Sequence, residues 1–193
     1  MRLSRGCAAL LVIVLCLAGA RADDVTDQID EALKAYRSHD TQTAIAALDA
    51  AANLLRQSRA DSLKKLLPDV PPGWTAGEAE GTAVGVALLG GGATASRAYH
   101  NGSQRVDVQI MADSPMLQGL AALLGSPFAA IGGMKTVVVN GRRMSYSAGD
   151  NSYTTMVANK IIVKVGGGKD TPDPTLKSFI GAIDFAAIEK LAR

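Results

Sequence analysis

The stretch RAYHNGSQRVDVQIMA at positions 97–112 decides the fold of the C-terminal part of this chain. Residues 105–110 alternate between polar residues and the apolar Val106, Val108 and Ile110. This pattern predicts a β-strand with one buried and one solvated face. The turn signal Asn101-Gly102-Ser103 comes just before that strand and predicts a hairpin with the residues that precede it.

The register of this hairpin should follow from its buried face, because a slip of one residue moves every side chain to the other side of the sheet. A three-residue loop places Arg97 opposite Asp107 and Ala98 opposite Val106, which keeps the two faces separate. A two-residue loop would place Arg97 opposite Val106 and mix them. We therefore expect the three-residue loop.

Two further hairpins are expected downstream. Asn140-Gly141 between apolar runs is the strongest short hairpin signal, and Asn159-Lys160 separates another pair of strands. The pairs that we expect are Val137 with Met144 in the first hairpin, and Met156 with Val163 and Thr155 with Lys164 in the second.

Helices complete this part of the chain. Asp113-Ser114-Pro115 is typical of a helix start, and a last helical region over residues 176–191 contains Asp184 as a candidate cap. About six strands joined by hairpins form an antiparallel sheet. Two helices packed on one face of that sheet give the class α+β.

Residues 23–67 predict two helices that form an antiparallel hairpin. The break lies at residues 38–41, and Asp40 is a suitable N-cap for the second helix. Small alanines (Ala44, Ala47 and Ala51) would let a partner helix approach closely. Larger apolar residues recur at helical spacing on both helices, namely Val25, Ile29, Leu33 and Tyr36 on the first and Ile45, Leu48, Ala52 and Leu55 on the second.

A proline-rich linker is expected at residues 68–73, because three prolines and a glycine cannot continue a helix. The α+β domain then spans residues 74–193. Trp74 opens it and is the only tryptophan of the chain. We expect Trp74 to anchor the linker on the core, with a role as a platform for a ligand as the alternative.

The first 22 residues have the three parts of a secretory signal peptide: a basic start, an apolar run at positions 7–17 and the cleavage pattern Ala20-Arg21-Ala22. The apolar run is too short to span a bilayer comfortably. Both cysteines, Cys7 and Cys16, lie in this leader, so the mature chain would contain no thiol and no disulfide. We expect a periplasmic or secreted protein.

Charge excludes nucleic acid as a partner. Three of the 20 Lys and Arg residues lie in the leader and none of the 18 Asp and Glu residues does, so the mature chain carries a net charge of −1. A nucleic-acid-binding protein would need a basic footprint. The 171 residues of the mature chain are enough for one ordinary domain with a helical appendage.

No pattern in the sequence builds a catalytic, cofactor or metal site, and we expect none. Gly90-Gly91-Gly92 begins a G-x-G-x-x-A match, but strand-like residues follow it where a dinucleotide site needs a helix. The only histidines are His39 and His100, which lie in different predicted domains. Metal ligation needs several such groups to converge.

Residues that could contact a partner or ligand fall into three groups. Trp74 is the first. The second comprises Leu88 and Leu89 with Gly90, Gly91 and Gly92, in a Gly- and Ala-rich segment that we expect to be a flexible flap. Arg142 and Arg143 flank the Asn-Gly turn and could meet a phosphate, a lipid head group or an acidic partner; as neighbours on a strand they point to opposite faces.

Part of the helical hairpin resembles a tetratricopeptide unit. Asp40, Ala44, Ile45, Leu48 and Ala51 occupy the turn and packing positions of that family. His39 replaces its turn glycine, Thr41 replaces its aromatic residue, and no second unit follows. A single unit does not make a repeat fold, which needs about three.

Most of the mature chain resembles uncharacterised secreted proteins of proteobacteria. The resemblance lies in the segments Leu67 to Trp74, Ser96 to Tyr99, Ile110 to Pro115 and Ala182 to Phe185. The Pro-Gly-Trp start, antiparallel strands and closing helix are also loosely similar to the PsbP/Mog1-type α+β fold. Neither resemblance implies an activity.

A secreted binding or accessory protein without catalysis is therefore the function that we expect, with an unknown protein or small-molecule ligand. Two alternatives stay open. One is a periplasmic hydrolase with an unrecognised site, and the other is a protein attached to the envelope through Leu88 and Leu89.

Cleavage of the leader is directly testable. When the full chain is produced in a bacterial host, intact-mass measurement of the purified product should place its N-terminus at Asp23. A product that still begins at Met1 contradicts export through this leader.

Overall fold

The computed structural model describes residues 20–84, 92–113 and 134–192. The chain forms two compact units, Met1–Leu54 and Leu55–Arg193, which are described one by one. The division falls inside the second helix. The last ten residues of that helix therefore belong to the same unit as the sheet.

The first unit contains helix α1 (Ala20–Arg37) and the start of helix α2 (Thr41–Lys64), so the expected helical hairpin is present. Asp40 caps α2: its carboxylate accepts hydrogen bonds from the Thr43 backbone N–H at 3.1 Å and from the Thr43 hydroxyl at 2.7 Å. These bonds lower the pKa of Asp40, because they favour its charged form. His39 takes a φ of 63° in the connection, where a left-handed residue ends α1.

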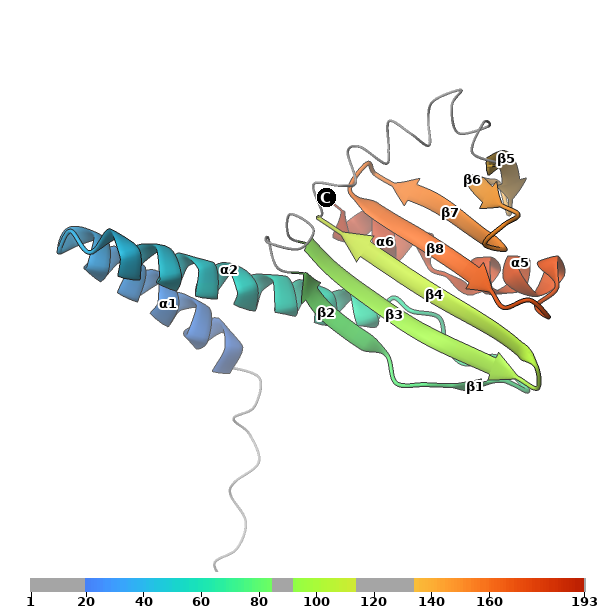
Figure 1. The fold of residues 1–193 in the computed structure, drawn as a ribbon, viewed down its shortest axis with the longest axis horizontal. Helices are drawn as coiled ribbons and strands as arrows, with labels where there is room; N and C mark the ends of the chain where they lie inside the picture. Colours follow the sequence, from blue (N-terminus) through green and yellow to red (C-terminus); the bar gives the residue numbers. More distant parts are fainter. Residues whose placement is uncertain (1–19, 85–91, 114–133, 193) are drawn as a thin grey trace, which may run out of the picture. The chain divides into compact units, whose positions relative to one another are not determined.

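The second unit is built on one antiparallel sheet of eight strands, two more than expected. Its strands are β1 (Thr75–Ala76), β2 (Glu80–Val84), β3 (Gly92–Asn101), β4 (Gln104–Ala112), β5 (Met134–Val139), β6 (Arg142–Ser147), β7 (Ser152–Val157) and β8 (Ile161–Gly167). They lie side by side in the order β1-β3-β4-β8-β7-β6-β5 (Figure 1). β2 also pairs with β3, along the same edge as β1. The class α+β is confirmed.

The register expected for the first hairpin is wrong. Asn101 pairs with Gln104, so the loop has two residues, and Arg97 lies opposite Val108 rather than Asp107. Gly102 takes a φ of 58° at the first loop position, as a two-residue hairpin turn allows. The shift of one residue sets the fully buried Tyr99 opposite Val106. The largest apolar side chain of β3 thereby joins the core face.

Of the other two hairpins, one has the expected register and one does not. Val137 lies opposite Met144, as expected. In the β7–β8 hairpin the expected pairs are wrong, because Thr155 lies opposite Val163 and Met156 opposite Ile162. Thr155 is therefore on the core face, where its hydroxyl donates to the Arg143 carbonyl oxygen at 3.0 Å and satisfies the buried group.

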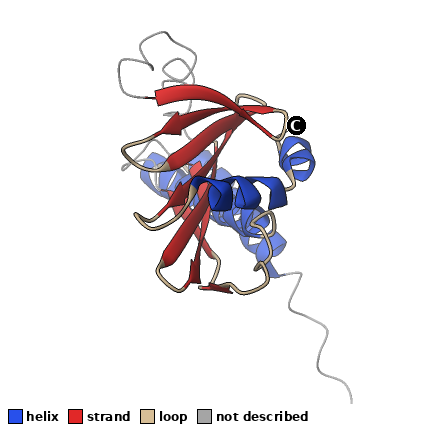
Figure 2. Cartoon of the chain, turned by 90° about the vertical axis from the view of Figure 1, so that its right-hand side faces the viewer, coloured by secondary structure: helices blue, strands red, loops and turns tan. Residues whose placement is uncertain are grey.

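Helices α5 (Asp173–Ala182) and α6 (Phe185–Leu191) cover one face of the sheet (Figure 2). Their buried residues join the alternating core residues of β3, β4, β7 and β8. Asp184 caps α6 as expected, with its carboxylate accepting from the Ala187 backbone N–H at 2.9 Å. The helix expected after Asp113 lies outside the described residues.

The end of α2 belongs to the same core. Ala60 and Leu63 are fully buried with the sheet residues. Gly81 of β2 lies so close to α2 that a Cβ there would come within 2.5 Å of the Lys64 side chain. Arg59 adds polar contacts, donating to the Asp113 carboxylate at 3.0 Å and to the Leu191 carbonyl oxygen at 2.8 Å.

Aromatic contacts fix the proline-rich segment to this core. The Tyr99 hydroxyl donates to the Pro68 carbonyl oxygen at 2.6 Å, and burial raises the pKa of Tyr99. Trp74 packs edge-on against Phe179 of α5, with ring centroids 4.9 Å apart. Tyr99 lies equally close to the same ring. The structure thus confirms Trp74 as an anchor.

A polar clamp joins β7 to the start of α5. The buried Tyr153 donates its hydroxyl hydrogen to the Asp173 carboxylate, which also pairs with Lys177 at 2.7 Å. The hydrogen bond from Lys177 is the main cause that lowers the pKa of Asp173. Burial is the main cause that raises the pKa of Tyr153, and the bond to Asp173 adds to it.

The clamp predicts a loss of stability in alkali. Because the pKa of Tyr153 is raised by folding, its contribution is complete below the ordinary tyrosine pKa near 10 and declines as the pH rises above it. The free energy of unfolding, measured by urea denaturation, should fall between pH 9.5 and 11. Tyr153→Phe should be destabilised by about 1 kcal/mol at pH 8 but fall less steeply with pH. A variant that declines as steeply as the wild-type chain contradicts this prediction.

Candidate functional site

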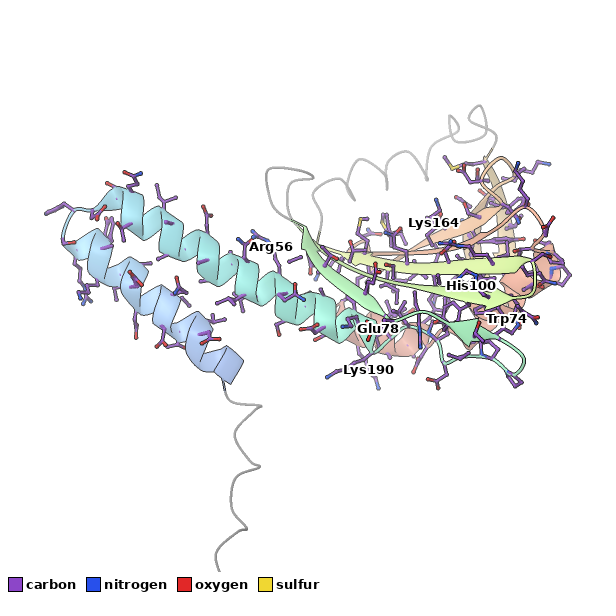
Figure 3. The ribbon with its side chains drawn as sticks, turned by 60° about the horizontal axis from the view of Figure 1, so that its bottom comes forward. Arg56, Trp74, Glu78, His100, Lys164 and Lys190 are labelled. Carbon is purple, nitrogen blue, oxygen red and sulfur yellow. The ribbon has the colours of Figure 1, made fainter. Side chains whose placement is uncertain are left out.

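The described members of the sequence-predicted contact set do not form one site. Trp74 is half-buried against Phe179, and lies with His100 at one end of the sheet, where β1 pairs with β3 (Figure 3). Gly92 begins β3 opposite Val84, with a φ of 135° that a residue with a side chain rarely adopts. Leu88, Leu89, Gly90 and Gly91 lie outside the described residues.

Arg142 and Arg143 have separate surroundings. The Arg142 guanidinium lies 4.2 Å from the centroid of the Phe185 ring and pairs with Glu189 at 2.8 Å. It therefore fixes the start of β6 to α6. Arg143 follows it on the strand and is exposed, on the opposite face of the sheet.

Groups with catalytic potential are scattered in the described part of the chain. His39 and His100 are both exposed, one in the helical connection and one at the end of β3. Tyr153 is buried, and burial raises its pKa, which disfavours the phenolate that a nucleophile would need. Across residues 20–84, 92–113 and 134–192, no three His, Cys, Asp or Glu side chains are grouped to hold a metal ion.

The helical hairpin of the first unit has an unusual seam. Between residues 24 and 54 the only buried residues are alanines: Ala32 and Ala35 on α1, and Ala44, Ala47 and Ala51 on α2. Their spacing places each set on one side of its helix. Each alanine buries a single methyl group, so this seam contributes little of the hydrophobic free energy that a helix pair needs.

The large apolar side chains of the hairpin lie on its surface instead. Ile29, Leu33, Tyr36, Ile45 and Leu48 are between 44% and 69% exposed, and together they are called the apolar face below. Leu33 and Tyr36 follow the buried alanines of α1 by one position, and Ile45 and Leu48 do so on α2. One position turns a helix by about 100°.

That rotation puts these four residues on the same side of the hairpin, and Ile29 joins them because it lies four positions before Leu33 on α1. The two helices run antiparallel, so an equal step in chain direction turns them in opposite senses when viewed from one end. The two rows of the apolar face therefore lie next to each other. The result is one continuous apolar surface that neither helix covers.

Charge is distributed unevenly along α1. Asp24, Asp27, Asp30 and Glu31 are exposed on its first part, and the exposed bases Lys34 and Arg37 lie in its last turns. This order suits the dipole of α1 itself. The connection also holds the charged carboxylate of Asp40, which opposes these two bases.

The sequence identified most residues of the apolar face, but it did not indicate that they are exposed. The helical spacing identified Ile29, Leu33, Tyr36, Ile45 and Leu48 as an apolar stripe on each helix. A stripe of large apolar residues ordinarily marks the packed side of a helix. The alanines at positions 44, 47 and 51 were the signal that the two helices meet elsewhere.

The chain matches no protein-family model, no curated protein and no solved structure. No helix in the described part of the chain is long and apolar enough to cross a membrane. Every buried side-chain nitrogen or oxygen within the described ranges has a hydrogen-bond partner. No orphaned polar group there points to a missing ligand, so the apolar face is the strongest candidate for function.

The two neighbouring arginines should respond differently to replacement. Arg142→Ala should lower the free energy of unfolding by about 1 kcal/mol, because it removes the contacts with Phe185 and Glu189. Arg143→Ala should change it by less than about 0.5 kcal/mol, as expected for an exposed residue. Urea denaturation of the two variants measures the difference, and equal losses would assign Arg142 no fixing role.

Proposed function

We propose that this chain is an exported, non-catalytic binding protein that acts through the apolar face of its helical hairpin. The observation that carries the proposal is the inversion of the hairpin, with alanines buried and Ile29, Leu33, Tyr36, Ile45 and Leu48 exposed. Large contiguous apolar patches are rare on proteins that work alone and mark interaction sites.

The physical argument concerns cost. Full burial of a large apolar side chain contributes roughly 1.5–3 kcal/mol, and each of these half-exposed side chains forgoes part of it. A hairpin held by alanines cannot offset this loss internally, since its seam buries so little. A partner that covers the apolar face would supply the missing burial for both helices at once.

Export rests on the leader at residues 1–22, and the absence of cysteine from the mature chain suits an oxidising compartment. Two observations favour binding over catalysis. The contact of the buried Tyr153 with the half-buried Asp173 serves to fix α5, and both histidines are exposed and far apart in the sequence.

Site-specific photocrosslinking tests the proposal in the organism that encodes the chain. A photoreactive phenylalanine analogue replaces Tyr36, which is aromatic, exposed and part of the apolar face. The matched control carries the analogue at Val138, which is 70% exposed on β5 of the sheet. Ultraviolet light should give a discrete adduct from position 36 and none from position 138.

A second pair of variants makes the result specific. Leu33→Glu, introduced into the chain that carries the photoreactive analogue at position 36, should abolish the adduct, because a charge on the apolar face opposes its burial. Val138→Glu should leave it unchanged. Absence of any adduct at position 36, or equal adducts from both positions, contradicts the proposal.

A further inference from the structure

We infer that the second unit binds a tetrahedral oxyanion, a phosphate or sulfate group, on the face of its sheet opposite α5 and α6 (Figure 2). Lys164 and Arg143 pair with the charge of the anion, and the hydroxyls of Thr154 and Ser145 donate to its oxygens. The site uses no residue of the apolar face. It therefore goes beyond the proposed function and does not depend on it.

The strand register brings these four side chains together. Thr154 of β7 lies directly opposite Lys164 of β8 on one side and Ser145 of β6 on the other. The neighbours of all three along their strands lie on the core face, so the three side chains point away from the core. Arg143 comes two positions before Ser145 and shares its face. Because opposite residues have Cβ atoms about 5 Å apart, the long side chains of Lys164 and Arg143 can reach one anion above the two hydroxyls.

The two bases have no partner of their own. In the described part of the chain, neither the Lys164 ammonium nor the Arg143 guanidinium forms an ion pair or a hydrogen bond. Lys164 is half-buried between its strand neighbours, whereas Arg143 is exposed. Every buried side-chain nitrogen in the described ranges has a partner, so the unpaired ammonium of Lys164 reaches solvent, where a ligand can meet it. A partly covered cation without a carboxylate lacks compensation for its lost hydration.

Two acids on the same face leave these bases uncompensated. Asp107 lies on β4, next to β8, but its carboxylate already accepts hydrogen bonds from the Arg105 guanidinium, two of them at 2.8 Å. Glu80 lies on β2, three strands from β8. The surroundings of Lys164 and Arg143 are therefore positive, which favours an anion.

The donor set favours a tetrahedral oxyanion over a carboxylate. Phosphate and sulfate can carry two negative charges, which match the two bases, and their oxygens point in directions that four separate donors can reach. A planar carboxylate carries one charge and two oxygens. Arginine is suited to such a group because its guanidinium can donate two parallel hydrogen bonds.

An NMR titration of the purified chain tests the site. Inorganic phosphate or sulfate is added at constant ionic strength, with chloride as the reference. The backbone amide signals of Ser145, Thr154 and Lys164 should shift and saturate. Lys164→Gln and Arg143→Gln should each weaken binding about tenfold, because each removes a charge-assisted contact. Thr154→Val keeps every charge and should weaken binding severalfold.

The matched control is Lys135→Gln. Lys135 is an exposed base on β5 and lies opposite Tyr146, on the other face of the sheet. Its replacement removes the same charge and should leave binding unchanged. Equal losses for Lys135→Gln and Lys164→Gln would show a response to overall charge and would overturn the inference.

Vesicles that contain phosphatidylglycerol form a second arm, which separates a free ion from the phosphate of a lipid headgroup. Binding of either probe that Lys164→Gln weakens supports the site, and binding of vesicles alone assigns the phosphate to a lipid. Shifts that do not saturate together with no binding of vesicles overturn the inference. Lys164→Gln should leave the Tyr36 photoadduct unchanged, so failure of this site leaves the proposed function standing.

Discussion

The alanine seam of the helical hairpin is the constraint on which the functional reading of this protein depends. Two helices can approach closely only where their facing side chains are small, and Ala32, Ala35, Ala44, Ala47 and Ala51 meet that condition. The consequence is geometric. Once the alanines occupy the seam, residues one position later must point about 100° away from it, and in this chain those residues are large and apolar.

The second unit distributes apolar volume in the ordinary way. Its large side chains are inside: Tyr99, Phe179 and Ile110 are fully or almost fully buried between the sheet and its helices. The contact of Trp74 with Phe179 and the bond from Tyr99 to Pro68 close one end of this core. Polar contacts also join the sheet to the helices that cover it: Asp173 of α5 binds Tyr153 of β7, and Arg142 of β6 pairs with Glu189 of α6. Within the described residues of this unit, the largest side chains therefore lie in its core.

Sequence patterns predicted the class and most elements of this fold because alternation and helical spacing report directly on burial. They failed where a local signal competed with a distant one. The Asn101-Gly102-Ser103 turn allows more than one loop length, and Tyr99 decides among them by entering a core made partly by α5. Thr155 is similar, since its burial depends on the Arg143 carbonyl of a neighbouring strand. Neither partner is visible in the hairpin's own sequence.

The apolar face is a second feature that local sequence predicts only in part. A stripe such as Ile29, Leu33 and Tyr36 indicates that burial of this helix surface is favourable, but it does not indicate what covers the surface. The buried alanines remove the adjacent helix as the cover, because its own large residues point the same way. What covers the apolar face must therefore lie outside the hairpin and must match a surface that is apolar along both helices.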